Sequence, residues 1–348
     1  MARGAQGIMG WDIGGAHVKI ACLSPRGRLR AAAQVPCPLW KGLDQLETVL
    51  LELHHRYDLT AHRHAVTMTG ELVDLFPDRR RGVRALLRQL LMHTGRSRIL
   101  VYTTTRGLLA VDSARRHVDA VASANWHATA AMVARRSPEA VLVDIGSTTT
   151  DIVAIQRGRV DARGLTDGDR LRHEELVYTG VVRTPVMAVV RRLPFRGEWQ
   201  GLAAEWFATM GDVYRLTGQL APRHYQSATA DGGGVTREEC ARRLARMLGR
   251  DAAEATAGEW RRNACHIAAE QQHQLRGALE HVLSRRRSSD GVTIVGAGCG
   301  RFVARALARQ LQCSYTDVAT LMGVPARWRE MASVCAPAVA VARLAAGL

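Results

Sequence analysis

Lysine is nearly absent from this sequence. Lys19 and Lys41 are the only lysines among 48 basic side chains, and arginine supplies the rest of a net charge of +16. The arginines are spread among acidic residues and alanines, without the interleaved aromatic residues of a surface that binds single-stranded nucleic acid. The charge therefore does not favour a nucleic-acid partner, although it suits an anionic small substrate. A salt-sensitive nucleic-acid-binding protein stays open as an alternative.

Long apolar runs are also missing. Although 47% of the residues are hydrophobic, no stretch reaches the length of about 18 apolar residues that a membrane span needs. Residues 1–7 contain no apolar segment of the kind that directs export. We therefore expect a protein of the cytoplasm that has no membrane partner.

Paired cysteine motifs are absent as well. The cysteines are scattered and include no Cys-x-x-Cys pair, which argues against a zinc site or a disulfide framework. We expect reduced thiols buried in the core. These are Cys22, Cys37, Cys240, Cys265, Cys299, Cys313 and Cys335.

The most informative stretch of the sequence is 140–155. An apolar run of strand length leads into an Asp-Ile-Gly triplet that begins at Asp144, then into four small hydroxyl residues, and Asp151 opens a second apolar run. This pattern predicts a β-hairpin with a polar tip. Glycine and small hydroxyl residues let an oxyanion approach backbone N–H groups, and a carboxylate at the strand end can hold hydrated Mg²⁺ beside it. We therefore expect a phosphate site with a metal.

The same pattern occurs earlier, at 8–23. Its Asp-Ile-Gly triplet begins at Asp12, 132 residues before Asp144, and the second apolar run of each copy ends in an Arg-Gly turn. Two matched hairpins at domain spacing indicate an internal duplication around a central cleft. The length of 348 residues also exceeds the usual size of one domain, so two lobes are expected.

Lys19 lies in the second apolar run of the first hairpin. In a chain that uses arginine almost everywhere else, a lysine retained here suggests a compact ammonium that pairs with phosphate. The alternative is an ordinary lysine at a strand end.

Hydrophobic spacing predicts strands that alternate with helices, the pattern of an α/β fold. We expect strands within 8–34 and at 64–68, 99–102, 140–156 and 293–295, and helices at about 43–57, 83–91, 106–136, 237–249 and 258–284. We place the first lobe at 1–136 and the second at 137–330, with a lobe-specific insertion at about 165–285. A helix of small residues at 331–348 is expected to pack back on the first lobe.

A glycine-rich turn follows the strand at 293–295. Gly296, Gly298 and Gly300 alternate with small residues and precede a helical pattern. A strand, a glycine turn and a helix N-terminus together favour a third element that faces an anion or a nucleotide.

Two Asp-x-Gly hairpins and a late Gly-x-Gly turn resemble the duplicated ribonuclease-H-like lobes of the actin, sugar-kinase and Hsp70 superfamily. Within it, the sequence is similar to the hydantoinase/oxoprolinase A group, and more narrowly to tetrahydromethanopterin-linked C1-transfer pathway proteins. The motifs that carry the narrower resemblance are 144–151, 68–77, Asn125-Trp126 and 175–185.

This resemblance implies a reaction. Archaeal members of the family join an aminomethylfuran-methyl diphosphate to the phenol of γ-glutamyl-tyramine and release diphosphate, as methanofuran-biosynthesis synthases. By analogy, an arginine-rich bacterial member serves the furan cofactor of formaldehyde oxidation in methylotrophs. The expected partners are therefore a small diphosphate and a phenolic amine, and a homodimer is left open.

For such a reaction, we expect Asp12 and Asp144 to anchor Mg²⁺ and Lys19 to pair with a phosphate. Asp151 is expected to position metal-bound waters or to accept the phenol proton, for which a phosphate oxygen is the other acceptable base. The expected phosphate-binding residues are Gly14, Gly15, Gly146, Ser147, Thr148, Thr149, Gly296 and Gly298. The resemblance assigns substrate contacts to Glu71, Asn125, Trp126, Tyr178, Arg183 and Thr184.

Structural interpretations stand beside these functional ones. Asp12 and Asp144 can instead cap their own turns, and 147–150 can be a solvated hairpin tip. His17 and His127 are more typical of hydrogen-bonded structural histidines than of catalytic bases.

Two other features have similar alternatives. Asn125-Trp126 can pack a helix in the cleft wall or contact the aromatic substrates. Asp231, which stands in a glycine-rich loop, is more typical of an Asx turn than of a flexible lid.

ATP use is the alternative chemistry. Hairpins of this kind bind ATP phosphates in other members of the superfamily, and a turn such as 296–300 holds the adenine side. The alternative function is therefore an ATP-dependent small-molecule kinase or an oxoprolinase-like ATPase. In this chain the turn can equally be a vestigial nucleotide wall.

Overall fold

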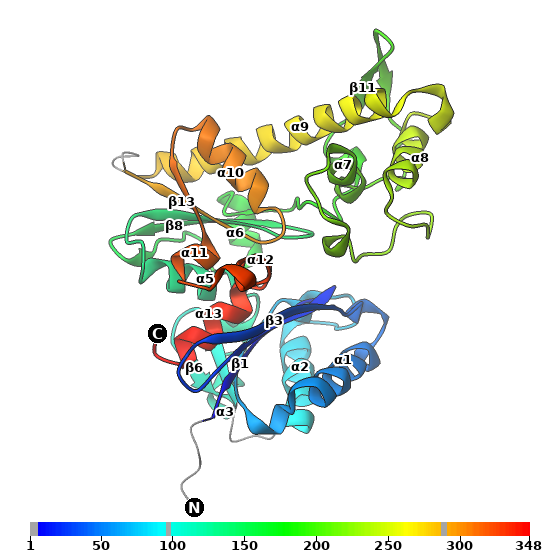
Figure 1. The fold of residues 1–348 in the computed structure, drawn as a ribbon. Helices are drawn as coiled ribbons and strands as arrows, with labels where there is room; N and C mark the ends of the chain where they lie inside the picture. The colour runs from blue at the N-terminus through cyan, green and yellow to red at the C-terminus, as the bar shows by residue number, and fades with distance from the viewer. Residues whose placement is uncertain (1–5, 95–98, 287–290) are drawn as a thin grey trace, which may run out of the picture. The chain divides into compact units, whose positions relative to one another are not determined.

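The hairpin at the start of the chain forms the middle of a six-stranded sheet. The computed structural model describes residues 6–94, 99–286 and 291–348, and the chain divides into two compact units (Figure 1). Unit 1 consists of Met1–Ala140, Ile155–Asp169 and Thr316–Leu348, and unit 2 of Val141–Ala154 and Arg170–Tyr315. The C-terminal part of unit 1 thus begins at Thr316, ahead of the boundary at 330 expected from the sequence.

The sheet of unit 1 has the strand order β3-β2-β1-β4-β5-β6. β1 pairs antiparallel with β2 and parallel with β4, so the first hairpin is extended by a crossover strand. The strands are β1 (Ile8–Ile13), β2 (His17–Leu23), β3 (Leu29–Pro36), β4 (Arg63–Met68), β5 (Ile99–Thr103) and β6 (Gly107–Ala110). Every residue of β1 is buried, as expected for a strand covered on both faces.

Helices cover this sheet. They are α1 (Leu43–Tyr57), α2 (Arg79–Thr94), α3 (Val111–Ala114), α4 (Val118–Val121), α5 (Asn125–Ala134), α11 (Val318–Leu321), α12 (Ala326–Val334) and α13 (Ala336–Ala345). The core includes Trp11 and Ile13 from β1, Leu50 from α1 and Leu86 from α2. The spacing of leucines at 43–57 therefore correctly predicted an amphipathic helix.

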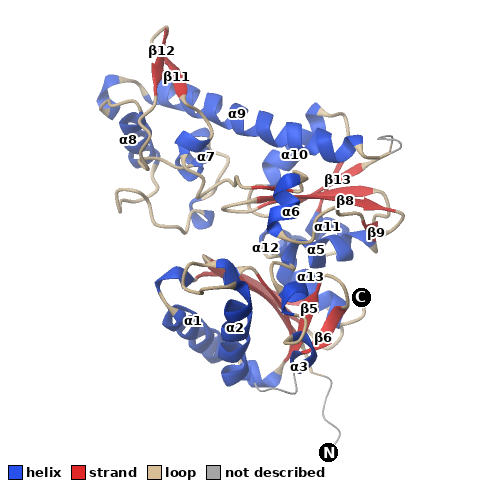
Figure 2. Cartoon of the chain, turned by 180° about the vertical axis from the view of Figure 1, so that it is seen from behind, coloured by secondary structure: helices blue, strands red, loops and turns tan. Residues whose placement is uncertain are grey.

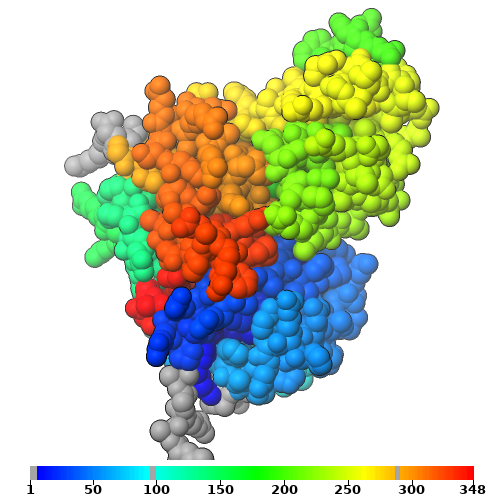
Figure 3. Space-filling view, viewed as in Figure 1, coloured from blue at the N-terminus to red at the C-terminus, as the bar shows by residue number. Residues whose placement is uncertain are grey.

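The C-terminal helices belong to unit 1. α13 contacts β1, β2, β4 and α5, and α12 contacts β3. Residues 336–343 of α13 are buried, and Figure 3 shows the red end of the chain beside blue residues from its beginning. The approach is close, because a Cβ atom at Gly10 would lie 1.9 Å from the carbonyl oxygen of Ala338. Glycine in the strand and alanine in the helix allow this packing.

A second sheet has the order β10-β8-β7-β13-β14, with β9 paired to β8. Most of its residues belong to unit 2, whereas β9 lies in the segment Ile155–Asp169 of unit 1. The strands are β7 (Ala140–Ile145), β8 (Thr150–Gln156), β9 (Arg159–Val160), β10 (Leu176–Val177), β13 (Thr293–Ala297) and β14 (Ser314–Asp317). In both sheets the first hairpin strand lies between its partner and a later strand. The predicted hairpin at 140–156 is confirmed.

The other elements of the second half lie mostly in the predicted insertion. They are α6 (Asp167–Arg172), the hairpin β11 (Arg192–Phe195) and β12 (Glu198–Gly201), α7 (Met210–Thr217), α8 (Arg237–Met247), α9 (Ala257–Ser284) and α10 (Arg301–Gln310) (Figure 2). α9 has 28 residues and begins with a capping box, in which the Glu259 carboxylate accepts from the N–H of Thr256 at 2.8 Å. The helices predicted at 237–249 and 258–284 are therefore confirmed.

Two expectations about the chain were wrong. The segment 106–136 is not one helical stretch, since it holds β6 and three short helices; the Thr103 hydroxyl donates to the carbonyl of Gly107 and fixes a hairpin turn there. The seven thiols are all free, but only four are buried, because Cys265 is exposed and Cys299 and Cys313 are partly exposed.

The loop around Asp231 is well fixed. The N–H of Gly233 donates to Asp231 Oδ1 at 3.0 Å, which confirms the predicted Asx turn. Arg243 from α8 donates to the same oxygen at 2.9 Å and to Asp212 on α7 at 2.7 Å. These bonds tie the glycine-rich loop to two helices, so it is not a flexible lid.

Candidate active site

The turn between β1 and β2 presents its N–H groups on one side. The N–H of Gly14 donates to the carbonyl of His17 at 2.9 Å and closes the turn. The carbonyl of Gly15 accepts from the N–H of Leu39 at 3.0 Å, and the next carbonyl accepts from Cys37 at 2.9 Å. Within the described residues, the N–H groups of Gly15 and Ala16 have no acceptor. Such a turn can bind an anion.

The turn between β7 and β8 has the same pattern of occupied carbonyl groups and open N–H groups. The N–H of Gly146 donates to the carbonyl of Thr149 at 2.9 Å, the distance found in the first turn. The Gly146 carbonyl accepts from the N–H of Val181 at 3.1 Å. The Ser147 carbonyl accepts from the N–H groups of Val182 and Arg183 at 3.1 and 2.8 Å. In the part of the chain that the structure describes, the N–H groups of 147–149 have no acceptor. The Gly146 and Ser147 carbonyls are thus occupied, whereas three N–H donors remain available to an anion.

The duplication extends beyond the hairpins. An isoleucine follows each aspartate, and its carbonyl accepts a 2.9 Å hydrogen bond from a turn. The Ile13 carbonyl accepts from the N–H of Thr69, which follows β4, and the Ile145 carbonyl accepts from the N–H of Gly300, which follows β13. Thr69-Gly70 in unit 1 is therefore the counterpart of 298–300 in unit 2. The two matched hairpins predicted from the sequence are confirmed as equivalent structures, with one in each unit.

In unit 1, the aspartate of the triplet lies beside a lysine. Asp12 and Lys19 are directly opposite each other on β1 and β2, and the Lys19 Nζ atom is 3.5 Å from Asp12 Oδ2. The carboxylate is only 3% exposed, whereas the lysine side chain is 23% exposed. The ammonium thus both balances the buried carboxylate and reaches toward solvent. Its predicted pairing with phosphate stays a prediction.

In unit 2, Asp144 ends β7 and is partly buried. The turn after β13 presses on it, because a Cβ atom at Gly298 would lie 2.6 Å from Asp144 Oδ1 and 2.1 Å from the carbonyl oxygen of Ile145. Gly298 also has a φ of +79°, which other residues rarely adopt. Glycine is therefore required at this position by the approach of two backbone segments.

The other glycines of this turn also serve packing. A Cβ atom at Gly296 would lie 2.3 Å from the Tyr315 hydroxyl, and one at Gly300 would lie 2.5 Å from the Ile145 side chain. Close packing against neighbouring backbone and side-chain atoms thus accounts for the alternating glycines. The predicted phosphate contacts of Gly296 and Gly298 stay a prediction.

The segment 179–184 packs against the turn between β7 and β8. A Cβ atom at Gly180 would lie 2.6 Å from backbone atoms of Ser147 and Thr148, so the two backbones are in direct contact. The Thr184 hydroxyl accepts from the N–H of Gly180 at 2.8 Å, and the Thr150 hydroxyl donates to the Thr179 carbonyl at 2.7 Å. The motif assigned to substrate contact by resemblance therefore holds the turn at 146–149 in place.

Gln271 of α9 fixes this support and was missed by sequence reasoning. Its side chain is fully buried, and its Nε2 donates to Thr179 Oγ1 at 2.7 Å and to the Gly180 carbonyl at 2.9 Å. Its Oε1 accepts from the hydroxyl of Tyr214 at 2.8 Å. The available signal was a glutamine at the i+4 spacing of the apolar residues Ile267 and Leu275.

Asp151 is engaged in a buried ion pair. Arg170 Nη1 donates to Asp151 Oδ1 at 2.8 Å, and the arginine is 1% exposed. The same guanidinium also donates to the carbonyl of Glu175 at 2.8 Å. The carboxylate therefore fixes the edge of the sheet, and its predicted role as a base stays a prediction.

The remaining predicted residues differ in exposure. Trp126 is 1% exposed and contacts the His127 ring edge to face at 5.2 Å, and His127 Nδ1 shares a 2.8 Å hydrogen bond with the Tyr102 hydroxyl. This arrangement fits the packing interpretation of Asn125-Trp126 and a structural His127. His17 is also buried at 6% exposure, whereas Tyr178 is 68% exposed.

Glu71 is buried behind the first turn. It is 1% exposed, and its Oε1 accepts from the N–H and the hydroxyl of Ser123 at 2.8 and 2.9 Å. Burial raises the pKa of Glu71 to about 6, and the charge of Asp167 adds to the rise. The carboxylate thus links the Thr69-Gly70 turn to the loop before α5.

Glu71→Gln should remove a pH dependence of stability. A carboxyl whose pKa is raised from 4.5 to about 6 in the folded protein stabilises the fold below pH 4.5, and this contribution is lost as the pH rises through 6. The free energy of unfolding of the variant, relative to wild type, should therefore rise by about 2 kcal/mol between pH 4.5 and 7. Urea unfolding at both pH values measures it. The exposed control Glu270→Gln should show no such trend, and parallel pH curves for Glu71→Gln and wild type would contradict the prediction.

The carboxylates fit a magnesium ion that keeps several waters. Mg²⁺ is held in proteins by one or two carboxylates and by phosphate oxygens, and each unit presents one such carboxylate next to open N–H donors. Within residues 6–94, 99–286 and 291–348, no three His, Cys, Asp or Glu side chains cluster in the manner of an all-protein metal site. None of the helices in these ranges is long and apolar enough to cross a bilayer.

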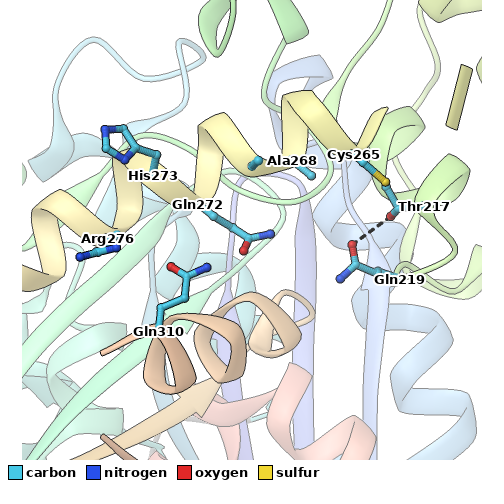
Figure 4. A pocket seen from close by; sticks show the side chains of 9 residues that line it. Thr217, Gln219, Cys265, Ala268, Gln272, His273, Arg276 and Gln310 are labelled. Atoms are coloured by element: carbon cyan, nitrogen blue, oxygen red, sulfur yellow. Dashed lines mark hydrogen bonds between the residues drawn. The ribbon is translucent and has the colours of Figure 1, made fainter. Parts of the chain in front are cut away.

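A separate cavity of about 450 Å³ is lined by residues of α9, α10 and the end of α7 (Figure 4). Gln272 and His273 of α9 and Gln310 of α10 line it, together with Arg276, which pairs with Glu280 at 2.8 Å. None of the predicted site residues borders it.

This architecture is the duplicated ribonuclease-H-like fold of the actin, sugar-kinase and Hsp70 superfamily. The nucleotide-free structure of acetone carboxylase, an enzyme of ATP-dependent acetone carboxylation, shares this fold with a TM-score of 0.53 at 11% identity. The match covers 97% of this chain and 70% of that one. The chain belongs to the hydantoinase/oxoprolinase family, which it matches over residues 62–347.

Two curated relatives are more similar in sequence. The (4-{4-[2-(gamma-L-glutamylamino)ethyl]phenoxymethyl}furan-2-yl)methanamine synthase of Methanocaldococcus jannaschii is 32% identical over 242 residues, which cover 69% of this chain and 71% of the relative. The synthase of the same name from Methanococcus vannielii is 33% identical over 119 residues, which cover 34% of this chain and 53% of the relative. The resemblance predicted from the motifs is confirmed.

Proposed function

We propose that the protein is a transferase of methanofuran or methylofuran biosynthesis. It condenses an (aminomethyl)furan-methyl diphosphate with the phenol of a tyramine-type or tyrosine-type amine and releases diphosphate. The main support is the 32% identity to the synthase of M. jannaschii, whose name denotes a phenoxymethyl furan, the ether that this reaction forms. The two turns with open N–H donors supply the chemistry that a diphosphate leaving group needs.

The reaction is a substitution at the furan-methyl carbon. The phenol oxygen forms a bond to this carbon as the carbon–oxygen bond to diphosphate breaks, and the electron pair leaves with the diphosphate. The phenol proton passes to a carboxylate or to a phosphate oxygen. Negative charge therefore grows on the diphosphate in the transition state, where the open N–H groups of 147–149 would donate to it.

Asp144 and Asp12 are the residues that would hold Mg²⁺ in this proposal. Bound there, the ion neutralises charge on the leaving diphosphate. Lys19 adds a second positive charge beside Asp12. The chain itself keeps the donors aimed outward, because the carbonyls of both turns are occupied by N–H groups of neighbouring segments.

An assay with purified protein and Mg²⁺ tests this function. The furan-methyl diphosphate and a phenolic amine should yield the ether and one diphosphate for each ether formed, measured by mass spectrometry and a pyrophosphate assay. ATP should not be consumed. Formation of ADP from ATP at enzyme-like rates, without ether formation, would instead support the kinase or oxoprolinase-like ATPase.

A further inference from the structure

We infer that Arg183 is a diphosphate ligand, the cation that unit 2 itself contributes to the leaving group. This inference rests on the proposed function and specifies a phosphate as the substrate group that Arg183 contacts. Its backbone N–H donates to the Ser147 carbonyl at 2.8 Å. Its side-chain Nη1 lies 3.5 Å from Thr148 Oγ1. Both ends of the residue therefore contact the turn whose N–H groups are open.

The backbone around Arg183 is firmly held. The carbonyl of Val182 accepts from the N–H of Gly211 at 2.9 Å, and the carbonyl of Thr184 accepts from the N–H of Met210 at 2.8 Å. Both donors belong to the first turn of α7, whose own N-terminus is closed by the capping box of Thr209 and Asp212. The root of the arginine side chain is therefore fixed relative to the anion-binding turn.

The geometry suits a phosphate oxygen. A guanidinium carries five donors in a plane, keeps its charge at any relevant pH, and binds phosphate through two parallel hydrogen bonds. An oxygen bound by the N–H groups of 147–149 would lie beside the Thr148 hydroxyl, which Arg183 approaches. When that hydroxyl accepts from Arg183, its own hydrogen is left to donate to the anion.

Lys19 does not replace this contact. Its ammonium belongs to unit 1 and lies 3.5 Å from the carboxylate of Asp12, so part of its charge serves that aspartate. Arg183 belongs to unit 2, as does the turn at 146–149. Each turn thus has a cation within its own unit.

Titration calorimetry of the full chain with inorganic pyrophosphate and Mg²⁺ tests the inference. Arg183→Gln should weaken pyrophosphate binding by about 10- to 100-fold, since a charge-assisted hydrogen bond contributes about 1.5 to 3 kcal/mol. Arg183→Lys should recover part of the affinity, because lysine keeps the positive charge but lacks the two parallel donors of the guanidinium. The matched control Arg191→Gln, at an exposed arginine of the same unit, should bind as wild type does.

Two further readouts separate binding from folding. Thermal unfolding of Arg183→Gln should match wild type, and its KM for the phenolic amine should stay unchanged while the KM for the diphosphate rises. Wild-type affinity for pyrophosphate in Arg183→Gln, with loss of binding in Asp144→Asn, would overturn the inference and leave the proposed function standing. A wild-type protein that binds no pyrophosphate would overturn both.

Discussion

Gly180→Ala should lower the rate of ether formation by about a thousandfold, the loss seen when donors to a developing anion are misplaced. The added Cβ atom would lie 2.6 Å from the carbonyl carbon of Ser147 and from the backbone nitrogen of Thr148, and 2.7 Å from the carbonyl oxygen of Gly146. Backbone atoms cannot rotate away as a side chain can, so the turn must shift. Overpacking of this kind also costs about 1 to 3 kcal/mol of stability.

A second glycine provides the control. Gly277 lies within α9, and a Cβ atom there would have no neighbour within 4 Å. Gly277→Ala should therefore raise the free energy of unfolding by about 0.5 to 1 kcal/mol and leave the rate unchanged. Both variants are measured by urea unfolding and by release of diphosphate. Full activity of Gly180→Ala would show that the turn at 146–149 is not where the reaction occurs.

Asp144→Asn should also abolish most of the activity, by about a thousandfold, because asparagine keeps the shape of the side chain but loses the charge that anchors the metal. The side chain is partly buried at the end of β7, so the fold should tolerate the amide. Circular dichroism and thermal unfolding should match wild type. The assay is diphosphate release at saturating Mg²⁺.

The control for this variant is Glu270→Gln, which removes a carboxylate from the exposed face of α9. It should retain the wild-type rate and the wild-type dependence on Mg²⁺ concentration. If Asp144→Asn showed the same rate and the same Mg²⁺ dependence as Glu270→Gln, the carboxylate of β7 would have no part in metal binding.

The sequence was sufficient to predict both hairpins, because their signals are local. A strand-length apolar run, an Asp-Ile-Gly triplet and small hydroxyl residues each constrain the backbone within a few positions. The direction in which the turn at 146–149 presents its donors was beyond local reasoning. It depends on N–H groups of 181–183 that occupy the Gly146 and Ser147 carbonyls.

Contacts between residues far apart in the sequence were the main features that the sequence did not predict. Gln271 contacts Thr179 and Gly180 across about 90 residues of sequence, and a single sequence gives no signal for such a pair. Asp151 has its cation in Arg170 on α6, whereas its position in the hairpin suggested only a catalytic carboxylate.

The error at 106–136 has a different origin. Alanine favours helix, and its abundance there concealed a short strand whose residues Leu108 and Leu109 pair with Tyr102 and Val101. Tertiary pairing with β5 outweighed local preference. The same segment does contain α5, so the prediction was right where alanine spacing matched a buried helix face.

The most direct test is a crystal structure of the protein with Mg²⁺ and inorganic pyrophosphate. We expect phosphoryl oxygens within hydrogen-bonding distance of the N–H groups of 147–149, with the metal beside the carboxylate of Asp144. Pyrophosphate bound away from the turn at 146–149, or a metal that Asp144 does not approach, would contradict the proposal.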